Sequence, residues 1–304
     1  MISSSTSGNS GGSSPKSLFG YEVLDFIGEG AGSSIYLVSH PDSHQIYALK
    51  HVVRKVEKDE RFVDQLQNEY EVGRHISHRG LRKSVDYKIN HTLLRKTIDA
   101  MLVMELVDGT PLESRLPDTL LETVDAFIQT GEALSHLHQL GYVHCDLKPN
   151  NILRDASGEV KVIDLGQACK VGTKKERIQG TPDYIAPEQV KCQEVTPKTD
   201  VFNFGATMYW CVCGKKMPTL FTLSKGENSF LIDSEIPSPR QNNPMVPEAL
   251  SNLIMDCVKN SASKRPEMAD CIRRLELVKH VMQRSSQPAN LASDDSRFAG
   301  AGAR

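Results

Sequence analysis

The sequence contains no run of about 18 consecutive apolar residues, the length that a membrane-spanning helix needs. Its first residues, MISSSTSGNSGG, lack the apolar core of a secretory signal. No segment of about 20–50 residues is repeated along the chain. We therefore expect no membrane span, no secretory leader and no repeat architecture.

An excess of either charge is also missing, since 36 lysines and arginines face 38 aspartates and glutamates, for a formal net charge of −2. A protein that binds nucleic acid through bulk positive charge is therefore not expected, although a local basic patch stays open. The seven cysteines are odd in number and scattered, which is typical of reduced thiols in a cytoplasmic protein.

Composition divides the chain into two tails and one long ordered region. Residues 1–19 are rich in serine and glycine, and residues 284–304 are polar and then small, so we expect both to be unstructured tails. Between them, residues 20–108 resemble strands with one helix, and residues 109–283 are mostly helical. The expected fold class is α+β, with a small β-rich lobe, a larger α-rich lobe and a hinge near residues 105–109.

Two charged residues lie on apolar faces of the expected elements. Lys50 shares a strand face with Ala48 and Val52, and Glu69 lies within the apolar stripe of a helix over 60–76. A lone buried charge is costly, so the simplest solution is that Lys50 and Glu69 pair. The alternative is a lysine that extends to solvent and a helix in a slightly different register. The expected strands are 21–28, 34–40, 46–53, 85–90 and 101–107, and the other expected helices are 120–140, 200–213, 247–258 and 266–283.

Two motifs indicate phosphate chemistry. The segment GEGAGSSIY, residues 28–36, lies between two expected strands, and its glycines would let the backbone approach phosphates, although a flexible hairpin loop is an alternative. The segment HCDLKPNNIL, residues 144–153, is far more specific. Within it, Asp146 could accept a hydroxyl proton, Lys148 could steady a phosphoryl group, and Asn151 offers an oxygen to Mg²⁺.

Four shorter motifs follow in a fixed order. IDLG, residues 163–166, places Asp164 after an apolar run, where it could hold Mg²⁺ together with Asn151 or could simply be a turn residue. GTPDYIAPE, residues 180–188, comes next. Asp200 in TDVFNFGA begins an apolar helix and could be its N-cap. Arg265 in KRP is a plausible partner for Glu188, or a surface residue before a helix that starts at Pro266.

With these motifs in this order, the chain resembles the protein kinase superfamily from about Tyr21 to Gln283. Lys148 within DLKPNN and the segment GTPDYIAPE are similar to its serine/threonine branch. The resemblance implies a two-lobed kinase fold. It also implies transfer of the ATP γ-phosphoryl group, with Mg²⁺, to serine or threonine hydroxyls of protein substrates.

The resemblance also implies a nucleotide site. The glycine loop would cover the phosphates, and Lys50, held by Glu69, would bind two of them. Ile35, Ala48 and Leu153 would enclose the adenine, with Met104 behind it and backbone groups of Glu105 and Val107 at its edge. The implied set is Ile27, Gly28, Glu29, Gly30, Ala31, Gly32, Ser33, Ser34, Ile35, Ala48, Lys50, Glu69, Met104, Glu105, Val107, Leu153 and Asp164.

The implied catalytic residues are Asp146, Lys148, Asn151 and Lys50, and the implied magnesium ligands are Asn151 and Asp164. Asp146 would accept the hydroxyl proton, and Lys148 would contact the γ-phosphate. Further residues would support this site: Thr181 shapes the acceptor position, Glu188 and Arg265 form a buried ion pair, and Asp200 supports the catalytic loop.

The chain departs from the family pattern at several positions. Ser33 replaces the third glycine, Leu165 replaces a phenylalanine, and Phe202 stands where tryptophan is common. Cys145 replaces an arginine that normally binds a phosphate on the activation loop, so we hypothesise that activity does not require phosphorylation of Thr173. Because Cys145 is next to Asp146, redox sensitivity is a further alternative.

Two other functions remain open at this stage. A pseudokinase would bind nucleotide or act as a scaffold without transfer, but Lys50, Asp146, Asn151 and Asp164 are all present. A small-molecule phosphotransferase would lack the GTPDYIAPE segment and its Arg265 partner. The expected partners are ATP and a protein with a serine or threonine acceptor, with no nucleic acid. The serine-rich N-terminus is a candidate for autophosphorylation.

Overall fold

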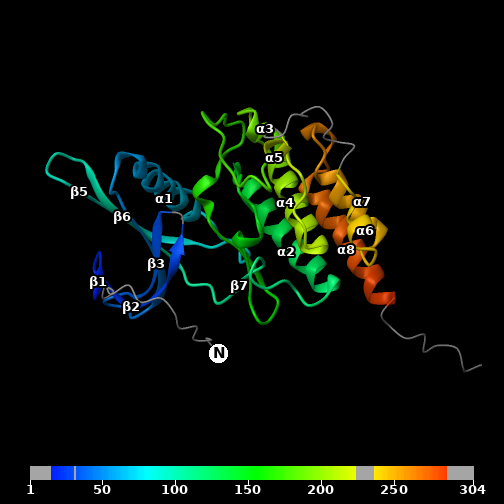
Figure 1. Cartoon of the computed structure of the whole chain (residues 1–304). Helices are drawn as coiled ribbons and strands as arrows, with labels where there is room; N and C mark the ends of the chain where they lie inside the picture. Colours follow the sequence, from blue (N-terminus) through cyan, green and yellow to red (C-terminus); the bar gives the residue numbers. More distant parts are fainter. Residues whose placement is uncertain (1–14, 31, 224–235, 286–304) are drawn as a thin grey trace, which may run out of the picture.

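The computed structural model describes residues 15–30, 32–223 and 236–285, which form two lobes (Figure 1). The first lobe contains β1 (Ser17–Leu18), β2 (Tyr21–Gly30), β3 (Ser33–Ser39), β4 (Ile46–Val53), α1 (Glu60–Gly73), β5 (Ser84–His91) and β6 (Thr97–Glu105). The second begins with β7 (Thr110–Pro111), α2 (Leu120–Gln139), β8 (Tyr142–Val143), β9 (Ile152–Arg154), β10 (Val160–Val162) and β11 (Cys169–Lys170). It continues with α3 (Pro187–Val190), α4 (Pro197–Cys213), α5 (Leu220–Leu223), α6 (Pro239–Asn242), α7 (Glu248–Cys257) and α8 (Met268–Ser285).

The first lobe is built on an antiparallel sheet with strand order β1-β2-β3-β4-β6-β5. Successive side chains of β4 and β6 point to opposite faces, because a strand has a period of two residues. Ala48 and Leu102 face helix α1 and pack with its Leu66, whereas Leu49 and Met101 face the other side. Packing against the apolar face of the sheet that carries Ala48 places α1 beside β4, the strand that also carries Lys50.

The second lobe is mostly helical, with two small sheets, β10-β9-β7 and β11-β8, on the side that meets the first lobe (Figure 1). Its core surrounds α4, whose side chains are buried on nearly all sides, as expected of a central helix. Phe127 of α2 and Phe204 of α4 meet edge to face with ring centroids 5.3 Å apart. Among the described residues, no helix combines the length and apolar character that spanning a membrane would require.

The sequence-based elements are found, and several of their ends differ. Helix α1 ends at Gly73 rather than residue 76, and α8 begins at Met268 rather than Pro266. Helix α4 begins at Pro197, and Thr196 caps it by accepting a hydrogen bond from the Lys198 N–H at 3.3 Å. Asp200 is therefore inside the helix and is not its N-cap.

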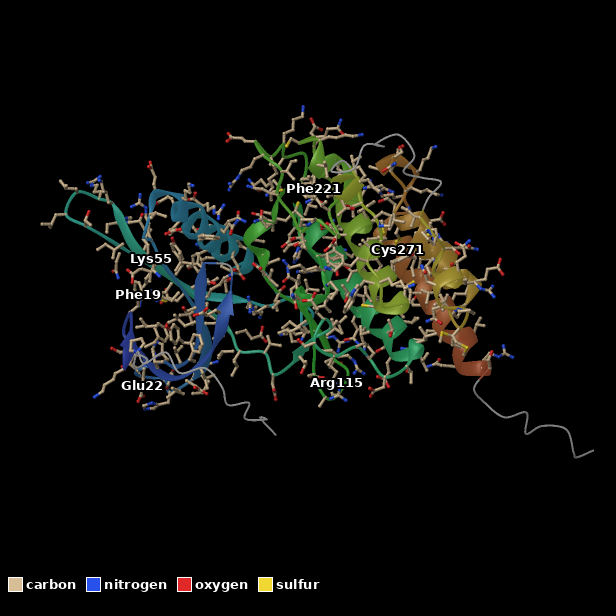
Figure 2. All side chains as sticks on the ribbon, viewed as in Figure 1. Phe19, Glu22, Lys55, Arg115, Phe221 and Cys271 are labelled. Atoms are coloured by element: carbon tan, nitrogen blue, oxygen red, sulfur yellow. The ribbon has the colours of Figure 1, made fainter. Side chains whose placement is uncertain are left out.

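The boundary of the N-terminal tail also differs from the composition-based one. Residues 1–14 lie outside the described residues, as do residues 286–304 of the expected C-terminal tail. Ser17 and Leu18, however, form strand β1 and pair with β2. Leu18 and Phe19 pack against the apolar face around Leu49, and Figure 2 shows Phe19 beside the sheet. Two apolar residues after a polar stretch were enough to start the fold earlier than composition indicated.

Candidate active site

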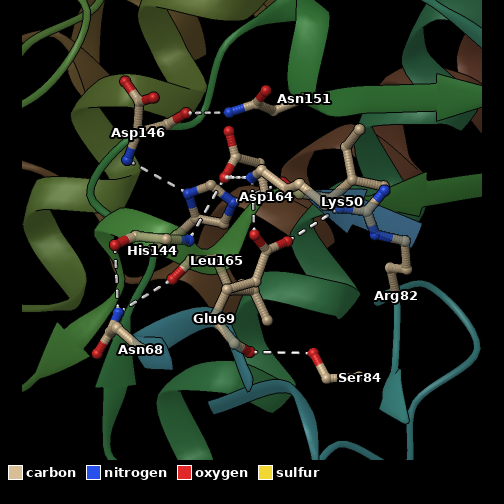
Figure 3. A network of polar contacts seen from close by, with 12 residues as sticks. Lys50, Asn68, Glu69, Arg82, Ser84, His144, Asp146, Asn151, Asp164 and Leu165 are labelled. Atoms are coloured by element: carbon tan, nitrogen blue, oxygen red, sulfur yellow. Dashed lines mark hydrogen bonds and ion pairs between the residues drawn. The ribbon is translucent and has the colours of Figure 1, made fainter. Parts of the chain in front are cut away.

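A network of ion pairs lies where the two lobes meet, and Glu69 of α1 is at its centre (Figure 3). Lys50 of β4 places its Nζ 2.9 Å from Glu69 Oε2 and 3.5 Å from Asp164 Oδ1. Arg82, in the segment before β5, donates from Nη2 to Glu69 Oε1 at 2.9 Å. The Glu69 side chain is only 3% exposed, so both of its oxygens need these partners. The pairing of Lys50 with Glu69 inferred from the sequence is present in the structure.

These pairings keep the charges of the network at neutral pH. Burial alone would lower the pKa of Lys50, but the carboxylates of Asp164 and Glu69 outweigh it and hold the pKa well above its usual range. The ammonium of Lys50 in turn holds the pKa of Asp164 well below its usual range, and Arg82 acts in the same direction. A lysine cation and an aspartate anion therefore face the same space.

The turn that carries Asp164 is fixed by Asn68, the neighbour of Glu69 on α1. Asn68 Nδ2 lies 2.8 Å from the carbonyl of Ala168, 3.2 Å from that of Leu165 and 3.3 Å from that of Gly166. Asp164 itself has φ +64°, in the left-handed region, and its Oδ1 accepts a hydrogen bond from the Gly166 N–H. Helix α1 thus positions both the partner of Lys50 and the turn that presents Asp164.

Asp146 lies on the loop between β8 and β9, and its two carboxylate oxygens have different partners. Thr181 donates from Oγ1 to Asp146 Oδ1 at 2.7 Å. Lys148 Nζ lies 3.0 Å from Asp146 Oδ2 and also donates to Thr181 Oγ1 at 3.0 Å. Asn151 Nδ2 donates to the Asp146 carbonyl at 2.9 Å. Asp146, Lys148 and Asn151 therefore lie together, as the motif spacing predicted, and Thr181, which the resemblance assigned to the acceptor position, joins their cluster.

His144 fixes this loop from the inside and has a defined tautomer. Its Nδ1 accepts a hydrogen bond from the Asp146 N–H at 3.2 Å, and its Nε2 lies 3.2 Å from the carbonyl of Ile163. A carbonyl can only accept, so Nε2 carries the proton and Nδ1 does not. The imidazole thereby connects the Asp146 loop to the residue before Asp164.

Asp200 supports the same loop from helix α4. Its Oδ2 accepts from the His144 N–H at 2.8 Å and its Oδ1 from the Cys145 N–H at 2.9 Å. Burial would raise the pKa of Asp200, but the hydrogen bond with His138 and those from the loop keep it below its ordinary value. These bonds hold Cys145 at φ +65°, a conformation that L-residues rarely adopt. The supporting role expected of Asp200 is what the structure shows.

Arg265 and Glu188 form the buried ion pair expected from their motifs. Nη1 lies 2.7 Å from Glu188 Oε1, and Nη2 lies 2.9 Å from Oε2. The guanidinium has five N–H groups, and the remaining three donate to the carbonyls of Lys198, Lys259 and Asn260. The pair joins α3, which follows the Thr181 segment, to the region before α8.

The glycine loop between β2 and β3 borders the same cavity as the charged network. Gly32 has φ +77°, and a Cβ there would come within 2.6 Å of the Phe62 ring of α1, so only glycine fits. Ala31 lies outside the described residues. A cavity of about 230 Å³ lies beneath the loop. Its lining includes Gly30, Ser33, Ile35, Lys50, Phe62, Arg82, Asp146, Lys148, Asn151 and Asp164.

Of the residues expected around an adenine ring, Ile35 lines this cavity, whereas Ala48, Met104 and Leu153 do not. Ala48 of β4 and Met104 of β6 are paired and buried, and Leu153 of β9 is nearly buried. The N–H of Glu105 donates to the Lys83 carbonyl at 3.0 Å, so only its own carbonyl is a candidate for a ligand. Val107 is partly exposed beyond it.

The other residues expected to belong to the glycine loop are more exposed to solvent. The Ile27 side chain is 51% exposed on β2, and no atom lies within 4 Å of where a Gly28 Cβ would stand. Glu29 pairs with Ser34 across the β2–β3 hairpin. These residues form the outer part of the loop, away from the buried charges.

The donor set fits a Mg²⁺-bound nucleotide. The Ser33 hydroxyl is buried at the cavity without a hydrogen-bond partner, as expected of a group whose acceptor is a ligand. Asn151 uses its Nδ2 on Asp146, which leaves its oxygen for a metal. In the described part of the chain, no cluster of three or more His, Cys, Asp or Glu residues could hold a metal. A site with only Asn151 and Asp164 as protein ligands suits Mg²⁺, which typically takes one or two protein ligands and completes its shell with phosphates and water.

Sequence reasoning missed Arg82, Asn68 and the structural role of His144. Arg82 follows buried Leu81 in a basic stretch, HRGLRK, that resembles a solvated surface. Asn68 is polar on an amphipathic helix, where solvent exposure is the usual expectation. His144 starts the HCD motif and was the one position with a usable signal.

Comparison with known proteins agrees with this geometry. A family model described as protein kinase domain matches residues 21–275. The serine/threonine-protein kinase PknA of Mycobacterium tuberculosis is 36% identical over 177 residues, which cover 56% of this chain and 41% of PknA. The serine/threonine-protein kinase PrkC of Bacillus subtilis is 26% identical over 263 residues, covering 82% of this chain and 39% of PrkC.

The match to a third relative spans a larger share of that relative's length. The protein named serine/threonine-protein kinases PknA of Corynebacterium glutamicum is 27% identical over 261 residues, covering 81% of this chain and 52% of that protein. The matched regions thus span about two fifths to one half of these relatives.

Proposed function

Because the chain belongs to the protein kinase domain family, we propose that it transfers the γ-phosphoryl group of Mg·ATP to serine or threonine hydroxyls of proteins. The observation that carries the proposal is the arrangement of Asp146. Its carboxylate is held by Thr181 and Lys148 at a cavity that Lys50 and Asp164 also line. A positioned base, two lysines and a metal-binding carboxylate are the parts that phosphoryl transfer requires.

The chain's own residues would do this work mainly by positioning and charge neutralisation. Asp146 orients the acceptor hydroxyl and accepts its proton. Lys50 binds the phosphates of ATP, and Lys148 contacts the γ-phosphate as negative charge redistributes. Asn151 and Asp164 hold Mg²⁺, which when bound neutralises phosphate charge.

The preference for serine and threonine rests on two supports. The relatives with this domain are named serine/threonine kinases. In this chain Lys148 and Thr181, which belong to the two segments typical of the serine/threonine branch, each contact a carboxylate oxygen of Asp146 and lie 3.0 Å from each other. A hydroxyl on a short side chain would reach Asp146 there.

A transfer assay with labelled ATP, Mg²⁺ and a generic protein acceptor tests this function. The wild type should produce phosphoserine or phosphothreonine, and Asp146→Asn should lower the rate by at least about a hundredfold, within the range of general-base contributions. Asp42→Asn, an exposed aspartate far from the site, is the matched control and should keep the full rate.

The other outcomes are distinct. Binding of ATP without transfer, under conditions where the acceptor is phosphorylated by a known kinase, would favour a pseudokinase. Transfer to a small hydroxylated acceptor but to no protein would favour a small-molecule phosphotransferase.

We also propose a cytoplasmic location, supported by seven free cysteines, and autophosphorylation as a candidate reaction. The serines of residues 1–14 lie outside the described residues. Phosphopeptide mapping after incubation with Mg·ATP alone tests the second point, with Asp146→Asn as control.

A further inference from the structure

Two cysteines meet beside the active site in a way that the transfer reaction does not use. Cys145 precedes Asp146, and Cys169 lies on β11, which pairs with β8. Their sulfurs are 3.6 Å apart, and both are free thiols. A disulfide bond is about 2.05 Å long, so the sulfurs need to approach by about 1.5 Å.

The two thiols differ in access. Cys145 is 2% exposed and is enclosed by Val143 and Val195. Cys169 is partly exposed and lines a cavity of about 240 Å³ together with Lys175, Arg177 and Arg61. Small oxidants can therefore reach Cys169 from solvent, whereas Cys145 is shielded from solvent.

The two thiols also differ in acidity. The hydrogen bond with Cys145 and the charge of Lys175 lower the pKa of Cys169 to about 7, against the opposing effects of burial and of Asp200. The same hydrogen bond, burial and Asp200 raise the pKa of Cys145. Cys169 is therefore the member of the pair that ionises more readily, and a thiolate is the form that reacts with oxidants.

We propose that Cys169 and Cys145 form a peroxide-reactive dithiol, in which Cys169 is oxidised first and Cys145 then closes a reversible disulfide. The Cys169 thiolate attacks one oxygen of hydrogen peroxide, the O–O bond breaks, and the leaving hydroxide takes a proton to become water. This gives Cys169 sulfenic acid. The Cys145 sulfur then attacks the Cys169 sulfur, the S–O bond breaks, and the hydroxide leaves as water with the Cys145 proton. In total, two thiols and one peroxide give one disulfide and two waters.

The bond would connect the loop that carries Asp146 to the segment that carries Thr181. Cys145 cannot move far, because Asp200 accepts from its N–H and Gln189 Nε2 donates to its carbonyl at 2.7 Å. The approach would therefore come mainly from Cys169 and β11. A thiol reductant would reverse the bond.

The chain contains an internal control for proximity alone. Cys257 of α7 and Cys271 of α8 also have their sulfurs 3.6 Å apart, but both are completely buried. Figure 2 shows Cys271 among the packed helices of the second lobe. Burial is the largest cause that raises the pKa of Cys257, and neither sulfur of this pair is open to solvent.

Peptide mapping of the full chain after peroxide treatment tests the proposal. The reduced protein is treated with a few equivalents of hydrogen peroxide, the remaining thiols are alkylated, and a tryptic digest is analysed by mass spectrometry. We expect peptides 116–154 and 162–170 to appear joined, with a loss of about 2 Da, and to separate after dithiothreitol. Cys257 and Cys271 should be recovered as reduced thiols in the same digest.

Two variants test the order of the steps. Cys145→Ala should accumulate sulfenic acid at Cys169, which dimedone traps, whereas Cys169→Ala should give no adduct at Cys145. Wild-type mapping is decisive even if a variant folds poorly. Recovery of both thiols in reduced form while partly exposed Cys192 is oxidised would overturn the proposal, as would equal oxidation of the Cys257–Cys271 pair.

Discussion

At the scale of single residues, the buried carboxylate of Glu69 connects the two halves of the active site. Lys50 and Arg82 both pair with it, and the preceding residue, Asn68, holds the turn of Asp164. A buried carboxylate with two cations is stable only while both are present, because each compensates part of the cost of removing charge from water. Arg82 is therefore as much a part of the site as the lysine that the motifs identify.

Replacing Arg82 with methionine tests this interpretation. The variant leaves one oxygen of Glu69 unpaired, so we expect a loss of about 1–3 kcal/mol in the free energy of unfolding. We also expect a rate of transfer lower on the order of tenfold, because Lys50 is held less firmly. Urea denaturation and the transfer assay measure the two effects. Arg79→Met, at an exposed arginine nearby, is the matched control, and equal behaviour of the two variants would contradict the assigned role of Arg82.

At the scale of elements, the catalytic loop between β8 and β9 has only one short 3-10 helix, Pro149–Asn151, and is held by its neighbours. Helix α4 supplies Asp200 to this loop, and α1 supplies Asn68 to the neighbouring turn that carries Asp164. Helix α3 is tied to the region before α8 by Glu188 and Arg265. Loops that carry chemistry need such external support, since their backbone groups lack the regular pairing of helices and strands.

The Glu188–Arg265 pair gives the clearest prediction at this scale. Arg265→Met leaves the buried carboxylate of Glu188 without its cation and three carbonyls without their donor, so stability should fall by about 3–5 kcal/mol. The double variant Glu188→Gln with Arg265→Met should be less destabilised than Arg265→Met alone, since the uncompensated charge is gone. Thermal unfolding measures both, and a double variant at least as unstable as the single one would argue against the assigned pairing.

The activation segment, which runs from Asp164 to Glu188, is held around Thr173 by backbone hydrogen bonds. Its backbone pairs with the 194–195 segment, where the Gly172 N–H donates to the Val195 carbonyl at 2.8 Å and the Val195 N–H to the Thr173 carbonyl at 3.0 Å. Cys145 offers no cation for a phosphate. We therefore expect Thr173→Ala, and wild-type protein treated with phosphatase, to transfer phosphate within about twofold of the untreated enzyme. A rate that depends on phospho-Thr173 would refute the hypothesis.

At the scale of the whole molecule, the site exists only where the lobes meet. Lys50, Glu69 and Ser33 come from the first lobe, whereas Asp146, Asn151 and Asp164 come from the second. A nucleotide with Mg²⁺ would contact both lobes at once and so stabilise their joint folded state.

Thermal unfolding with ADP tests this coupling. At about 100 times its dissociation constant, ADP with Mg²⁺ should stabilise the protein by about 2.7 kcal/mol, a rise of several degrees in Tm. Removal of Mg²⁺ with EDTA should reduce the shift, and Asp164→Asn should make it insensitive to Mg²⁺. An equal shift with and without the metal would contradict the assigned roles of Asn151 and Asp164.

Sequence by itself determined the order of elements and most of the residues at the site. Periodicity predicted the strands and helices because burial of one face requires it, and the HCDLKPNN spacing brought Asp146, Lys148 and Asn151 together because they share one loop. Even the Lys50–Glu69 pair followed from two charges on apolar faces. Local patterns of this kind can be interpreted from the sequence without knowing which distant segments are in contact.

Only the tertiary structure decided the contacts between segments far apart in the chain. Arg82 at Glu69, Asn68 at the Asp164 turn and Cys169 beside Cys145 each depend on how separate elements pack. Their residue types are ordinary for solvated surfaces or scattered thiols, so no pattern marks them in advance. Packing gives each of them its partner, because a buried polar group is stable only when folding places a complementary group within reach.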